Sequence, residues 1–344
     1  MRFLFVGGGT GGHLAPALGL AEALRERGHE TLFLSGGREV EQDFLREAGP
    51  AVPLGTERGR LPRPLRLLRA MVRARRQARA FRPDLVVGLG GLTGAAALAA
   101  RRGRPLVLLE GNRVVGRGVR LLRPFASGAL TLFPEPAAEL PNGVCVGPVG
   151  RRALRPRPPA EARAHFGLPA EGPVLLLTGG SQGALALNRA VAAAAAALAA
   201  DGVRLLAAAG PGKEEELRRA AVAAGLTAVV RGHLAEMGAA YSAADLALCR
   251  GGAATVAELW LHRLPAVIVP YPGHADRQQV WNARALEPGV EMVEEPAAAV
   301  QRARELLADE ALRARMRTAL AATAPAEGLE QGVRILEEIA GRRA

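Results

Sequence analysis

RFLFVGGGTGGH, residues 2–13, predicts the fold class of this chain. It joins a short apolar run, residues 2–6, to a glycine-rich turn, and a helical pattern over residues 14–27 follows at once. A short apolar run before a glycine turn and a helix is typical of a buried parallel strand in an α/β protein. The segment therefore predicts one strand–turn–helix unit.

The same alternation of apolar runs and helical patterns continues along almost the whole chain. Further strands are predicted at 31–35, 84–88, 105–109 and 128–132, and then at 174–178, 204–208, 228–232, 246–249 and 266–269. Further helices are predicted over 187–200 and 213–224. Strands that alternate with helices form parallel sheets covered on both faces, so we expect an α/β protein with doubly wound domains.

The domain organisation follows from a break in this pattern. Residues 151–159, RRALRPRPP, lack periodicity and are rich in proline and arginine, which indicates a linker in a chain of 344 residues. We predict one domain over residues 1–148 and a second over 149–325, with ligands at the carboxyl ends of the strands, in a cleft between the domains. The tail, 326–344, is expected to form a helix that packs back on the first domain.

Four glycine-rich turns each follow a predicted strand and precede a helix. They are GGGTGGH at 7–13, GLGGLTG at 88–94, GGSQG at 179–183 and RGGAAT at 250–255. Glycine lets a ligand approach the backbone closely, and a helix N-terminus offers free N–H groups and a positive dipole end. Glycine can also serve only to tighten a turn, which suffices as an explanation for one loop but not for two in each half. The turns therefore predict cradles for phosphate or another polar ligand.

The first turn also satisfies the dinucleotide-binding pattern G-x-G-x-x-G, which leaves an NADP-dependent oxidoreductase open. That pattern expects an acidic residue near the end of the second strand, where this chain has SGGR at 35–38. Arg38 would suit the extra phosphate of NADP, but a dinucleotide site leaves the third and fourth turns unexplained. No G-x-x-x-x-G-K-[ST] sequence occurs, which excludes a P-loop NTPase.

The chain carries a net charge of +12, and Lys213 is the single lysine among its 45 basic residues. A GC-rich genome explains the arginine bias, yet a basic protein is still attracted to phosphates and anionic membranes. Cys145 and Cys249 show no metal or redox spacing, which favours a reducing compartment. The N-terminus lacks a signal-peptide layout, and the longest apolar run, 190–200, is too short to span a bilayer. We expect a cytosolic protein that can sit on a membrane surface.

Five motifs occur in an order that resembles a known family. They are GGGTGGH, GLGGLTG, GGSQGALALN at 179–188, CRGGAATVAEL at 249–259 and HADRQQVWNA at 274–283. Together they resemble, over nearly the whole chain, the MurG-type N-acetylglucosaminyltransferases of bacterial cell-wall synthesis. The resemblance implies a GT-B architecture, which consists of two facing Rossmann-like domains. It places an acceptor site in the first domain and a UDP-GlcNAc site in the second, and implies no metal and no cofactor.

The resemblance also implies the reaction. GlcNAc passes from UDP-GlcNAc to the 4-hydroxyl of MurNAc in undecaprenyl-pyrophosphoryl-MurNAc-pentapeptide (lipid I), with inversion at the anomeric carbon. The products are lipid II and UDP, which places the enzyme in peptidoglycan synthesis, cell shape and cell division. A UDP-GlcNAc epimerase of the same architecture stays open as an alternative.

The family pattern assigns site residues to this chain. The catalytic set that it implies is His13, Thr10, Glu110 and Asn112, with Gly9, Gly90 and Gly91 at the acceptor or its pyrophosphate. UDP-GlcNAc binding is expected from Gly11, Gly12, Arg151, Ser181, Gln182, Gly183, Leu234, Ala253, Ala254, Glu258, Gln278 and Gln279.

Each assignment has a chemical reason and a plainer alternative. An imidazole suits a general base, so His13 is expected to take the acceptor proton, although it also fits a helix cap. Glu258 is expected to accept hydrogen bonds from the ribose, although the helix dipole alone favours an acid there. Gln278 and Gln279 donate and accept, which suits the hydroxyls of GlcNAc. Leu234 is expected to meet the uracil through its main chain.

The chain departs from the family pattern at three places. It reads GPVGR at 147–151 where the family has G-N-P-V-R, which shifts the alignment of Arg151 by one residue. Gly111 stands where glutamine is common between Glu110 and Asn112. Leu92 stands where an aromatic is usual, so a stacking contact is lost there.

Residues 58–82, from Arg58 to Arg82, hold ten arginines and no acidic residue, with apolar residues interleaved. A basic amphipathic segment is typical of binding to an anionic membrane surface, and a solvated helix is the alternative. A lipid-linked acceptor favours the membrane, so we predict a peripheral protein on the cytoplasmic face of the cell membrane. Nucleic acid is not expected, because aromatic residues make up only 3% and no binding motif occurs.

Overall fold

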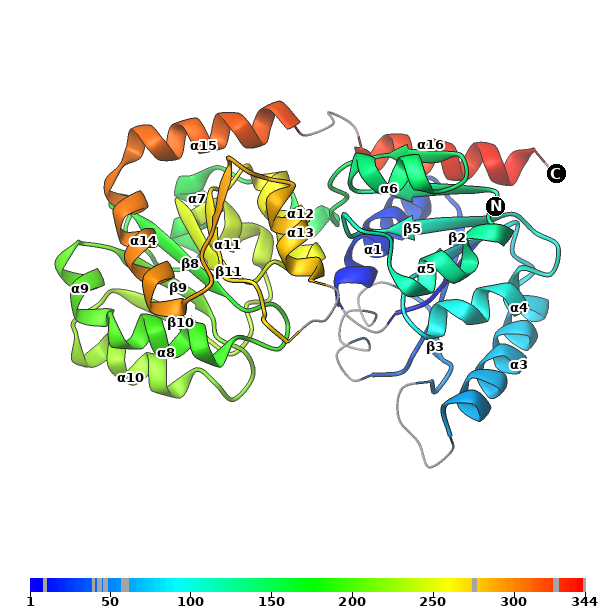
Figure 1. The fold of residues 1–344 in the computed structure, drawn as a ribbon, viewed down its shortest axis with the longest axis horizontal. Helices are drawn as coiled ribbons and strands as arrows, with labels where there is room; N and C mark the ends of the chain where they lie inside the picture. Colours follow the sequence, from blue (N-terminus) through cyan, green and yellow to red (C-terminus); the bar gives the residue numbers. More distant parts are fainter. Residues whose placement is uncertain are drawn as a thin grey trace. The chain divides into compact units, whose positions relative to one another are not determined.

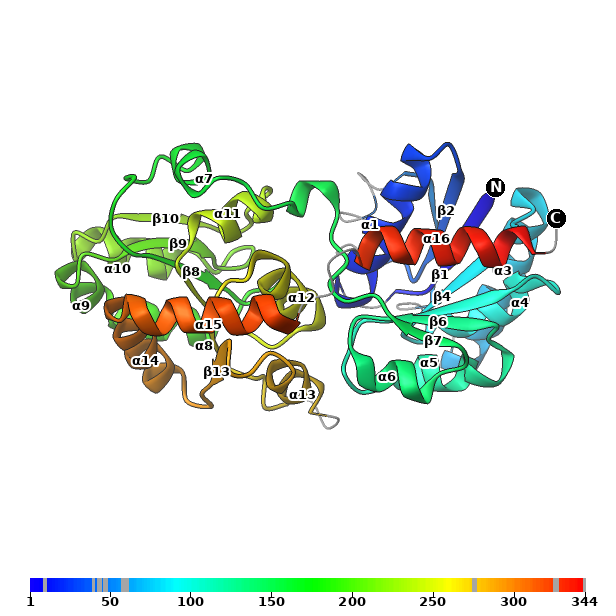
Figure 2. The same cartoon turned by 90° about the horizontal axis from the view of Figure 1, so that it is seen from above.

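The chain forms two compact α/β units. The computed structural model describes residues 1–8, 11–38, 41, 45, 49–56, 62–273, 277–323 and 328–342, and only the backbone of residues 11–13 and 63. Unit 1 comprises Met1–Arg152 with Pro325–Ala344, and unit 2 comprises Ala153–Ala324. In Figure 1 unit 1 carries both chain ends, and Figure 2 shows the same ribbon from above. Residues 149–152, which were predicted to begin the second domain, make their contacts mainly within unit 1.

Unit 1 is built on a parallel sheet of seven described strands in the order β3-β2-β1-β4-β5-β6-β7. The strands are β1 (Arg2–Val6), β2 (Glu30–Ser35), β3 (Ala51–Pro53), β4 (Leu85–Leu89), β5 (Leu106–Glu110), β6 (Gly128–Thr131) and β7 (Gly143–Cys145). The helices are α1 (Gly11–Glu26), α3 (Arg63–Phe81), η1 (Thr93–Ala96), α4 (Ala97–Arg101), α5 (Arg117–Leu122), η2 (Arg123–Phe125), α6 (Pro134–Glu139) and α16 (Gly328–Gly341). The strand order reverses between β1 and β4, which is the switch point where doubly wound sheets bind ligands.

The sheet of unit 1 is buried on both faces, as its continuous apolar strands require. Phe3 and Phe5 of β1 enter one core with α1 and α16, whereas Leu4 and Val6 enter a second core with α3, α4 and α5. The C-terminal helix α16 completes the first core and lies along α1, as Figure 2 shows in red. Glu337 of α16 pairs with Arg27 at 2.8 Å, which fixes that end of the helix.

Unit 2 is built on a parallel sheet of six described strands in the order β10-β9-β8-β11-β12-β13. The strands are β8 (Val174–Thr178), β9 (Arg204–Ala208), β10 (Ala228–Arg231), β11 (Leu246–Cys249), β12 (Ala266–Ile268) and β13 (Val290–Met292). The helices are η3 (Arg152–Leu154), which spans the boundary of the units, α7 (Pro159–His165), α8 (Leu185–Ala193), α9 (Ala195–Ala200), α10 (Glu215–Ala223), α11 (Met237–Ala243), α12 (Ala253–His262), α13 (Gln278–Arg284), α14 (Pro296–Ala308) and α15 (Glu310–Thr323). The order again reverses beside the first strand of the unit, between β8 and β11.

The predicted α/β fold with parallel sheets is confirmed, and each predicted strand is present to within one residue at its ends. Three strands were not predicted: β3, β7 and β13. Each has three residues and lies at a sheet edge, where most of its side chains are partly exposed. A three-residue strand at a sheet edge has one paired neighbour and needs no continuous apolar run, so periodicity does not reveal it.

The single helix predicted over 187–200 is wrong in one detail, because the structure has two helices, α8 and α9, that meet at Ala194. Ala194 leaves the helical conformation with ψ near 6°. Its N–H still donates to Ala190 O at 3.2 Å, and Leu198 N donates to Ala194 O at 3.0 Å. The break is therefore a local bend that keeps Leu187 and Leu198 in one core. An alanine-rich run carries no residue that marks such a bend.

The first residues of unit 2 are anchored to α11 and α12. His262 donates from Nε2 to Leu154 O at 2.8 Å, and its ring packs 5.3 Å from that of Tyr241. A Cβ on Gly238 would lie 2.3 Å from Ala153 O, so α11 approaches the linker closely only because Gly238 has no side chain. Burial lowers the pKa of His262 to about 4, and the bond to Leu154 opposes that shift. His262 is therefore neutral at physiological pH.

We expect His262 to make the protein sensitive to acid. An unfolded histidine has a pKa of about 6.5, so the stability that neutral His262 supplies is present above pH 6.5 and is lost as the pH falls towards 4. Between pH 7.5 and 4.5 the wild type should lose about 2–3 kcal/mol more free energy of unfolding than His262→Gln, which keeps a donor but cannot protonate. Urea denaturation at the two pH values measures this.

His165→Gln is the matched control, because His165 is half-exposed. It should lose as much stability as the wild type between the two pH values. An equal loss in His262→Gln and the wild type would contradict the assignment.

Candidate functional site

In unit 1 the turns after β1 and β4 pack backbone against backbone at the carboxyl edge of the sheet. Gly8 N donates to Gly90 O at 3.4 Å. Gly91 has a φ of +83°, and a Cβ on it would lie 2.1 Å from Gly8 O. Gly118 at the start of α5 is equally confined, with its Cβ position 2.7 Å from Gly91 O. Gly90 and Gly91 therefore hold the second turn on the first.

Glu110 organises the loop that follows β5. Its carboxylate is fully buried and accepts hydrogen bonds from Asn112 N at 2.9 Å, Asn112 Nδ2 at 3.0 Å and Gly116 N at 2.8 Å. Both oxygens are thus occupied by the loop itself. Asn112 is also buried. Glu110 therefore positions the loop from 112 to 116. A direct catalytic role for Glu110 stays a prediction.

A second buried carboxylate, Glu41, lies behind the first turn. It accepts hydrogen bonds from Gly37 N at 2.7 Å and Arg38 N at 3.2 Å, and is 1% exposed. A Cβ on Gly8 would lie 2.6 Å from its Oε1. Glu41 therefore organises the turn after β2 and packs against Gly8 of the turn after β1, and the sequence alone does not indicate this role.

The other residues that were predicted to form the site in unit 1 lie partly outside the described residues. Gly9 and Thr10 are not described, and Gly11, Gly12 and His13 are known only as the backbone that begins α1. Arg151 is half-buried and groups with unit 1, whereas the predicted UDP-GlcNAc residues from Ser181 onward lie in unit 2. The neighbouring Gly150 O lies 2.9 Å from the Cβ position of Gly19 in α1.

In unit 2 the third glycine turn rests on the loop that follows β9. Gly183 has a φ of +66°, and a Cβ on it would lie 2.1 Å from Ala209 O. The ammonium group of Lys213 donates to Gln182 O at 2.6 Å, and Asn188 Nδ2 donates to Ala209 O at 2.8 Å. Ser181 and Gln182 are exposed at the tip of the turn, where a ligand can reach them. Backbone, amide and ammonium groups thus fix this turn.

The fourth glycine turn packs against the start of α13. A Cβ on Gly251 would lie 2.4 Å from Gln279 O, and the buried Asn282 donates to Gly251 O at 3.4 Å. Gln279 accepts a hydrogen bond from Tyr271 N at 2.8 Å. The structure thereby brings Gln278 and Gln279 to the turn that begins α12. Ala253 and Ala254 lie in the first turn of α12, where helix N–H groups lack an acceptor within the helix.

Glu258 of α12 is half-buried and interacts with the fully buried Tyr241. Burial raises the pKa of the Tyr241 phenol well above its usual range, and the negative charge of Glu258, to which the phenol hydrogen-bonds, raises it further. Burial also raises the pKa of the neighbouring Cys249 thiol to about 12. Tyr241 therefore stays a hydrogen-bond donor to Glu258, and Cys249 stays an inert thiol. The side chain of Leu234 is buried, which leaves only its main chain for a ligand.

Sequence reasoning missed Tyr241, Lys213 and Asn188, which hold the predicted residues in place. Two signals were visible: Lys213 is the single lysine, and Tyr241 is one of two tyrosines. No local pattern links either residue to its turn, because both contacts join segments far apart in sequence. Within the described part of the chain, no group of three or more His, Cys, Asp or Glu side chains could hold a metal ion, and His274 and Asp276 lie outside that part.

Two domain families match this chain. Residues 3–131 match the N-terminal domain of glycosyltransferase family 28, and residues 174–324 match its C-terminal domain. The matched regions correspond to the cores of units 1 and 2.

Named relatives and solved structures agree with this match. A UDP-N-acetylglucosamine–N-acetylmuramyl-(pentapeptide) pyrophosphoryl-undecaprenol N-acetylglucosamine transferase of Sodalis glossinidius is 38% identical over 321 residues, covering 89% of this chain and 88% of the relative. Its namesake from a Nocardioides species is 41% identical over 304 residues, covering 83% and 81%. The crystal structure of Acinetobacter baumannii MurG superposes with a TM-score of 0.74 at 26% identity, covering 98% of this chain and 99% of that one.

The calicheamicin glycosyltransferase CalG4 shares the fold, with a TM-score of 0.67 at 21% identity over 100% of this chain and 99% of that one. The expected GT-B class and the resemblance to the MurG-type enzymes are confirmed by these matches. The chain belongs to glycosyltransferase family 28, among the UDP-N-acetylglucosamine–N-acetylmuramyl-(pentapeptide) pyrophosphoryl-undecaprenol N-acetylglucosamine transferases.

Proposed function

We propose that this glycosyltransferase moves GlcNAc from UDP-GlcNAc to the 4-hydroxyl of MurNAc in lipid I, giving lipid II and UDP for peptidoglycan synthesis. The proposal rests on one observation. Two glycine turns, the Glu258 side chain and the start of α13 all lie at the carboxyl edge of the unit 2 sheet. This arrangement occurs in a chain whose relatives carry the name of that transferase.

Unit 2 supplies what a leaving nucleoside diphosphate needs. The exposed tip of the third turn, Ser181 to Gly183, and the first turn of α12 offer N–H and hydroxyl donors for the diphosphate. Glu258 offers acceptors for the ribose, with Tyr241 fixing its direction. Gln278 and Gln279 offer donors and acceptors for the hydroxyls of GlcNAc. These contacts orient the sugar and stabilise the charge that grows on UDP.

Unit 1 supplies the acceptor side of the proposed reaction. The acceptor oxygen attacks the anomeric carbon while the bond from that carbon to UDP breaks, and UDP leaves with the electron pair. His13, at the start of α1, takes the acceptor proton. Gly90, Gly91 and the loop that Glu110 positions bind the acceptor and its pyrophosphate, with Gly9 and Thr10 as further predicted contacts. One attack on the opposite face inverts the configuration.

The two alternative activities are not favoured. A UDP-GlcNAc epimerase would act on the same donor without an acceptor, and an NADP-dependent oxidoreductase would use the first turn alone. The relatives that match most of this chain are named transferases, and the matched family is a glycosyltransferase family. The transferase proposal also uses all four glycine turns.

We expect the purified chain to transfer radiolabelled GlcNAc from UDP-GlcNAc to a short-chain lipid I analogue, with EDTA present. Labelled lipid product would verify both the acceptor class and independence from metal. The readout is chromatographic separation of labelled lipid from free sugar. Release of free GlcNAc derivatives without lipid product would favour the epimerase and contradict the proposed transfer.

The variant His13→Ala tests the proposed base in the same assay. It should lower kcat by about 100-fold or more while leaving the affinity for UDP-GlcNAc nearly unchanged, because a general base contributes about 10²–10⁴-fold. An unchanged kcat would remove His13 from the catalytic set.

We expect Glu258→Ala to weaken UDP-GlcNAc binding by about 10–100-fold, since hydrogen bonds to a charged group contribute about 1.5–3 kcal/mol. Tyr241→Phe should weaken it by a smaller factor, because only the group that directs the carboxylate is lost. Isothermal titration calorimetry with UDP-GlcNAc and with UDP measures both variants.

Glu215→Ala is the matched control, because Glu215 is an exposed acid in the first turn of α10. It should bind UDP-GlcNAc as the wild type does. An unchanged affinity in Glu258→Ala would contradict the ribose assignment.

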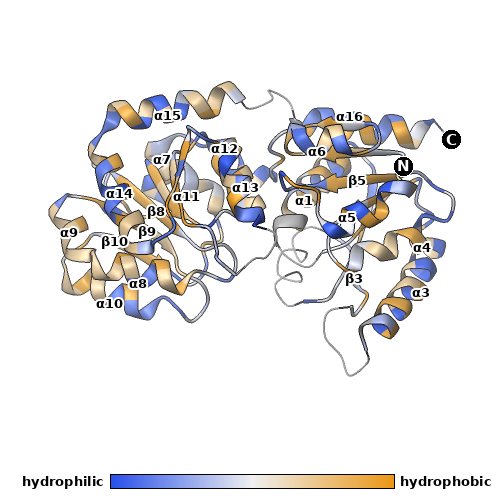
Figure 3. Cartoon of the chain, in the orientation of Figure 1, coloured by the Kyte–Doolittle hydropathy of each residue, from blue (hydrophilic) through white to orange (hydrophobic). Residues whose placement is uncertain are grey.

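Helix α3 supports the proposed binding to an anionic membrane surface on the cytoplasmic face. Its small residues Ala70, Ala74 and Ala78 are buried against the sheet, whereas its bulky Leu65, Leu68 and Val72 are 49%, 58% and 64% exposed. Figure 3 shows apolar residues interleaved with hydrophilic ones along this helix. An apolar stripe among arginines suits the interface of a bilayer. Residues 58–61 of the predicted basic segment lie outside the described part.

We expect Leu65→Gln, Leu68→Gln and Val72→Gln together to lower co-sedimentation with phosphatidylglycerol vesicles by at least about tenfold, because each buried apolar side chain contributes about 1.5–3 kcal/mol. Transfer to a soluble acceptor analogue should be unaffected. Val222→Gln, at a 78% exposed apolar side chain of unit 2, is the control and should sediment normally. Equal sedimentation of both variants would move the membrane contact away from α3.

Within the described residues, no helix has the length and apolarity needed to cross a bilayer.

A further inference from the structure

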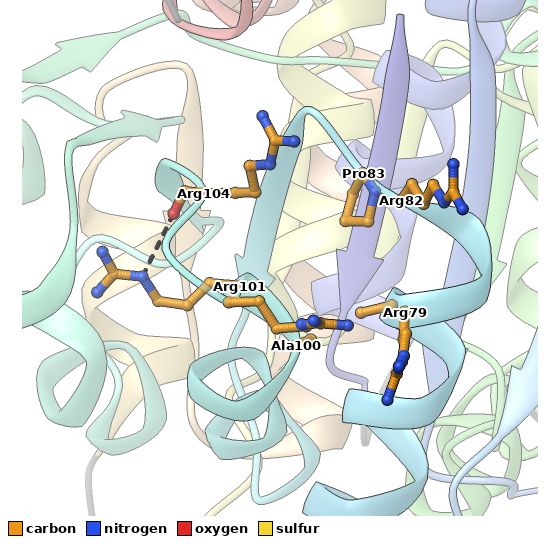
Figure 4. A pocket seen from close by; sticks show the side chains of 8 residues that line it. Arg79, Arg82, Pro83, Ala100, Arg101 and Arg104 are labelled. Atoms are coloured by element: carbon orange, nitrogen blue, oxygen red, sulfur yellow. Dashed lines mark hydrogen bonds between the residues drawn. The ribbon is translucent and has the colours of Figure 1, made fainter.

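Unit 1 carries a pocket of about 380 Å³ between the end of α3 and the turn that joins α4 to β5 (Figure 4). It is lined by Ala78, Arg79, Arg82, Pro83, Ala100, Arg101, Arg102 and Arg104. Five of these eight residues are arginines and none is acidic. The volume falls within the range of small-ligand sites, about 300–1,000 Å³. We call it the arginine pocket.

The arginine pocket is separate from the candidate functional site. Pro83 and Arg104 stand just before β4 and β5 begin, whereas the glycine turns and the Glu110 loop follow the ends of those strands. Because the strands are parallel, their starts share one edge of the sheet and their ends share the other. β4 has five residues, so roughly 15 Å separates the two edges. A ligand here would not touch the transferred sugar.

The positive charge of the pocket is not balanced by the protein. None of the five guanidinium groups forms an ion pair with an acidic side chain among the described residues. Arg101 Nε donates to Arg104 O at 3.3 Å, drawn as the dashed line in Figure 4. The nearest acid in the sequence, Asp84, is engaged by Arg2 N at 2.8 Å. The side chains of Arg79, Arg102 and Arg104 therefore present unused donors.

A structural role explains only part of this cluster. Cations are favoured at helix C-termini, and the pocket lies at the ends of α3 and α4. Both helices end with an arginine in the left-handed conformation, Arg82 with φ 52° and Arg102 with φ 44°, a position where glycine is preferred. The helix dipole accounts for one cation at each end. It does not account for five around one hollow, where they repel one another.

We propose that the arginine pocket binds a compact phosphate group. Guanidinium groups match phosphate oxygens with paired, parallel hydrogen bonds, and several of them around one hollow can hold a phosphate or a diphosphate from different sides. The same chemistry occurs in a free phosphorylated compound and in the headgroup of an anionic phospholipid. Binding relieves the mutual repulsion of the arginines.

The test uses inorganic pyrophosphate as the probe and residue-level protection as the readout. Phenylglyoxal modifies accessible arginines, and peptide mass spectrometry gives the rate at each one. Pyrophosphate should slow modification of Arg79, Arg102 and Arg104 at least fivefold. The exposed arginines Arg69, Arg75 and Arg76 lie on the same helix outside the pocket and should change less than twofold. The residue-level readout separates this pocket from pyrophosphate bound in unit 2.

Two charge-matched variants give an independent measurement. The pocket variant carries Arg79→Gln, Arg102→Gln and Arg104→Gln, and the control variant carries Arg69→Gln, Arg75→Gln and Arg76→Gln. Both should keep the circular-dichroism spectrum and the thermal unfolding profile of the wild type, which verifies that unit 1 is folded. The pocket variant alone should lose one class of pyrophosphate sites in calorimetry. Equal slowing at all six arginines, or equal pyrophosphate binding by both variants, would overturn the proposal for a free ligand.

Experiments with lipid vesicles distinguish a free phosphorylated compound from a phospholipid headgroup. If the ligand is a lipid headgroup, phosphatidylglycerol vesicles should protect Arg102 and Arg104, which lie outside α3, and phosphatidylcholine vesicles should not. Protection by pyrophosphate but not by phosphatidylglycerol identifies a free phosphate compound. Selective protection by neither probe would overturn the proposal as a whole.

Discussion

At the carboxyl edges of both sheets, backbone carbonyl groups fill the space that the Cβ atom of any residue other than glycine would need. A Cβ on Gly91 would lie 2.1 Å from Gly8 O, and one on Gly183 equally close to Ala209 O. At Gly251 the obstacle is Gln279 O, 2.4 Å away. Such nesting brings turns from non-adjacent parts of the chain to one edge, and it holds only while these residues lack side chains. Tight packing and ligand binding are thus two uses of the same glycines.

Buried carboxylates do the next part of the positioning. Glu110 and Glu41 are almost completely buried, yet each accepts hydrogen bonds from backbone N–H groups of its own loop. A buried charge is stable only when its oxygens are so engaged. Glu258 differs, because it is only half-buried and its carboxylate accepts a hydrogen bond from the Tyr241 phenol. Carboxylates therefore divide into those that shape loops and one suited to contact a substrate.

Unit 1 has two arginine-rich surfaces that differ in their arrangement. Along α3, alanines face the core and the bulky leucines face outward, which is the reverse of an ordinary surface helix and suits a lipid interface. At the end of that helix, arginines from two segments surround a hollow instead. A genome bias accounts for the number of arginines. It does not account for their gathering where the helices of unit 1 end.

The fold class, the central strands and the order of the glycine turns could be predicted from the sequence alone, because buried parallel strands need continuous apolar runs and tight strand-to-helix turns favour glycine. The sequence also carried the family resemblance. It did not reveal the three-residue edge strands β3, β7 and β13, most of whose side chains are partly exposed, or the bend at Ala194. Only the tertiary structure shows that Tyr241 supports Glu258 and that Lys213 supports Gln182. It also shows that Glu110 supports its own loop. The arginine pocket has the same origin, because its lining comes from two helix ends that meet only when the sheet is formed.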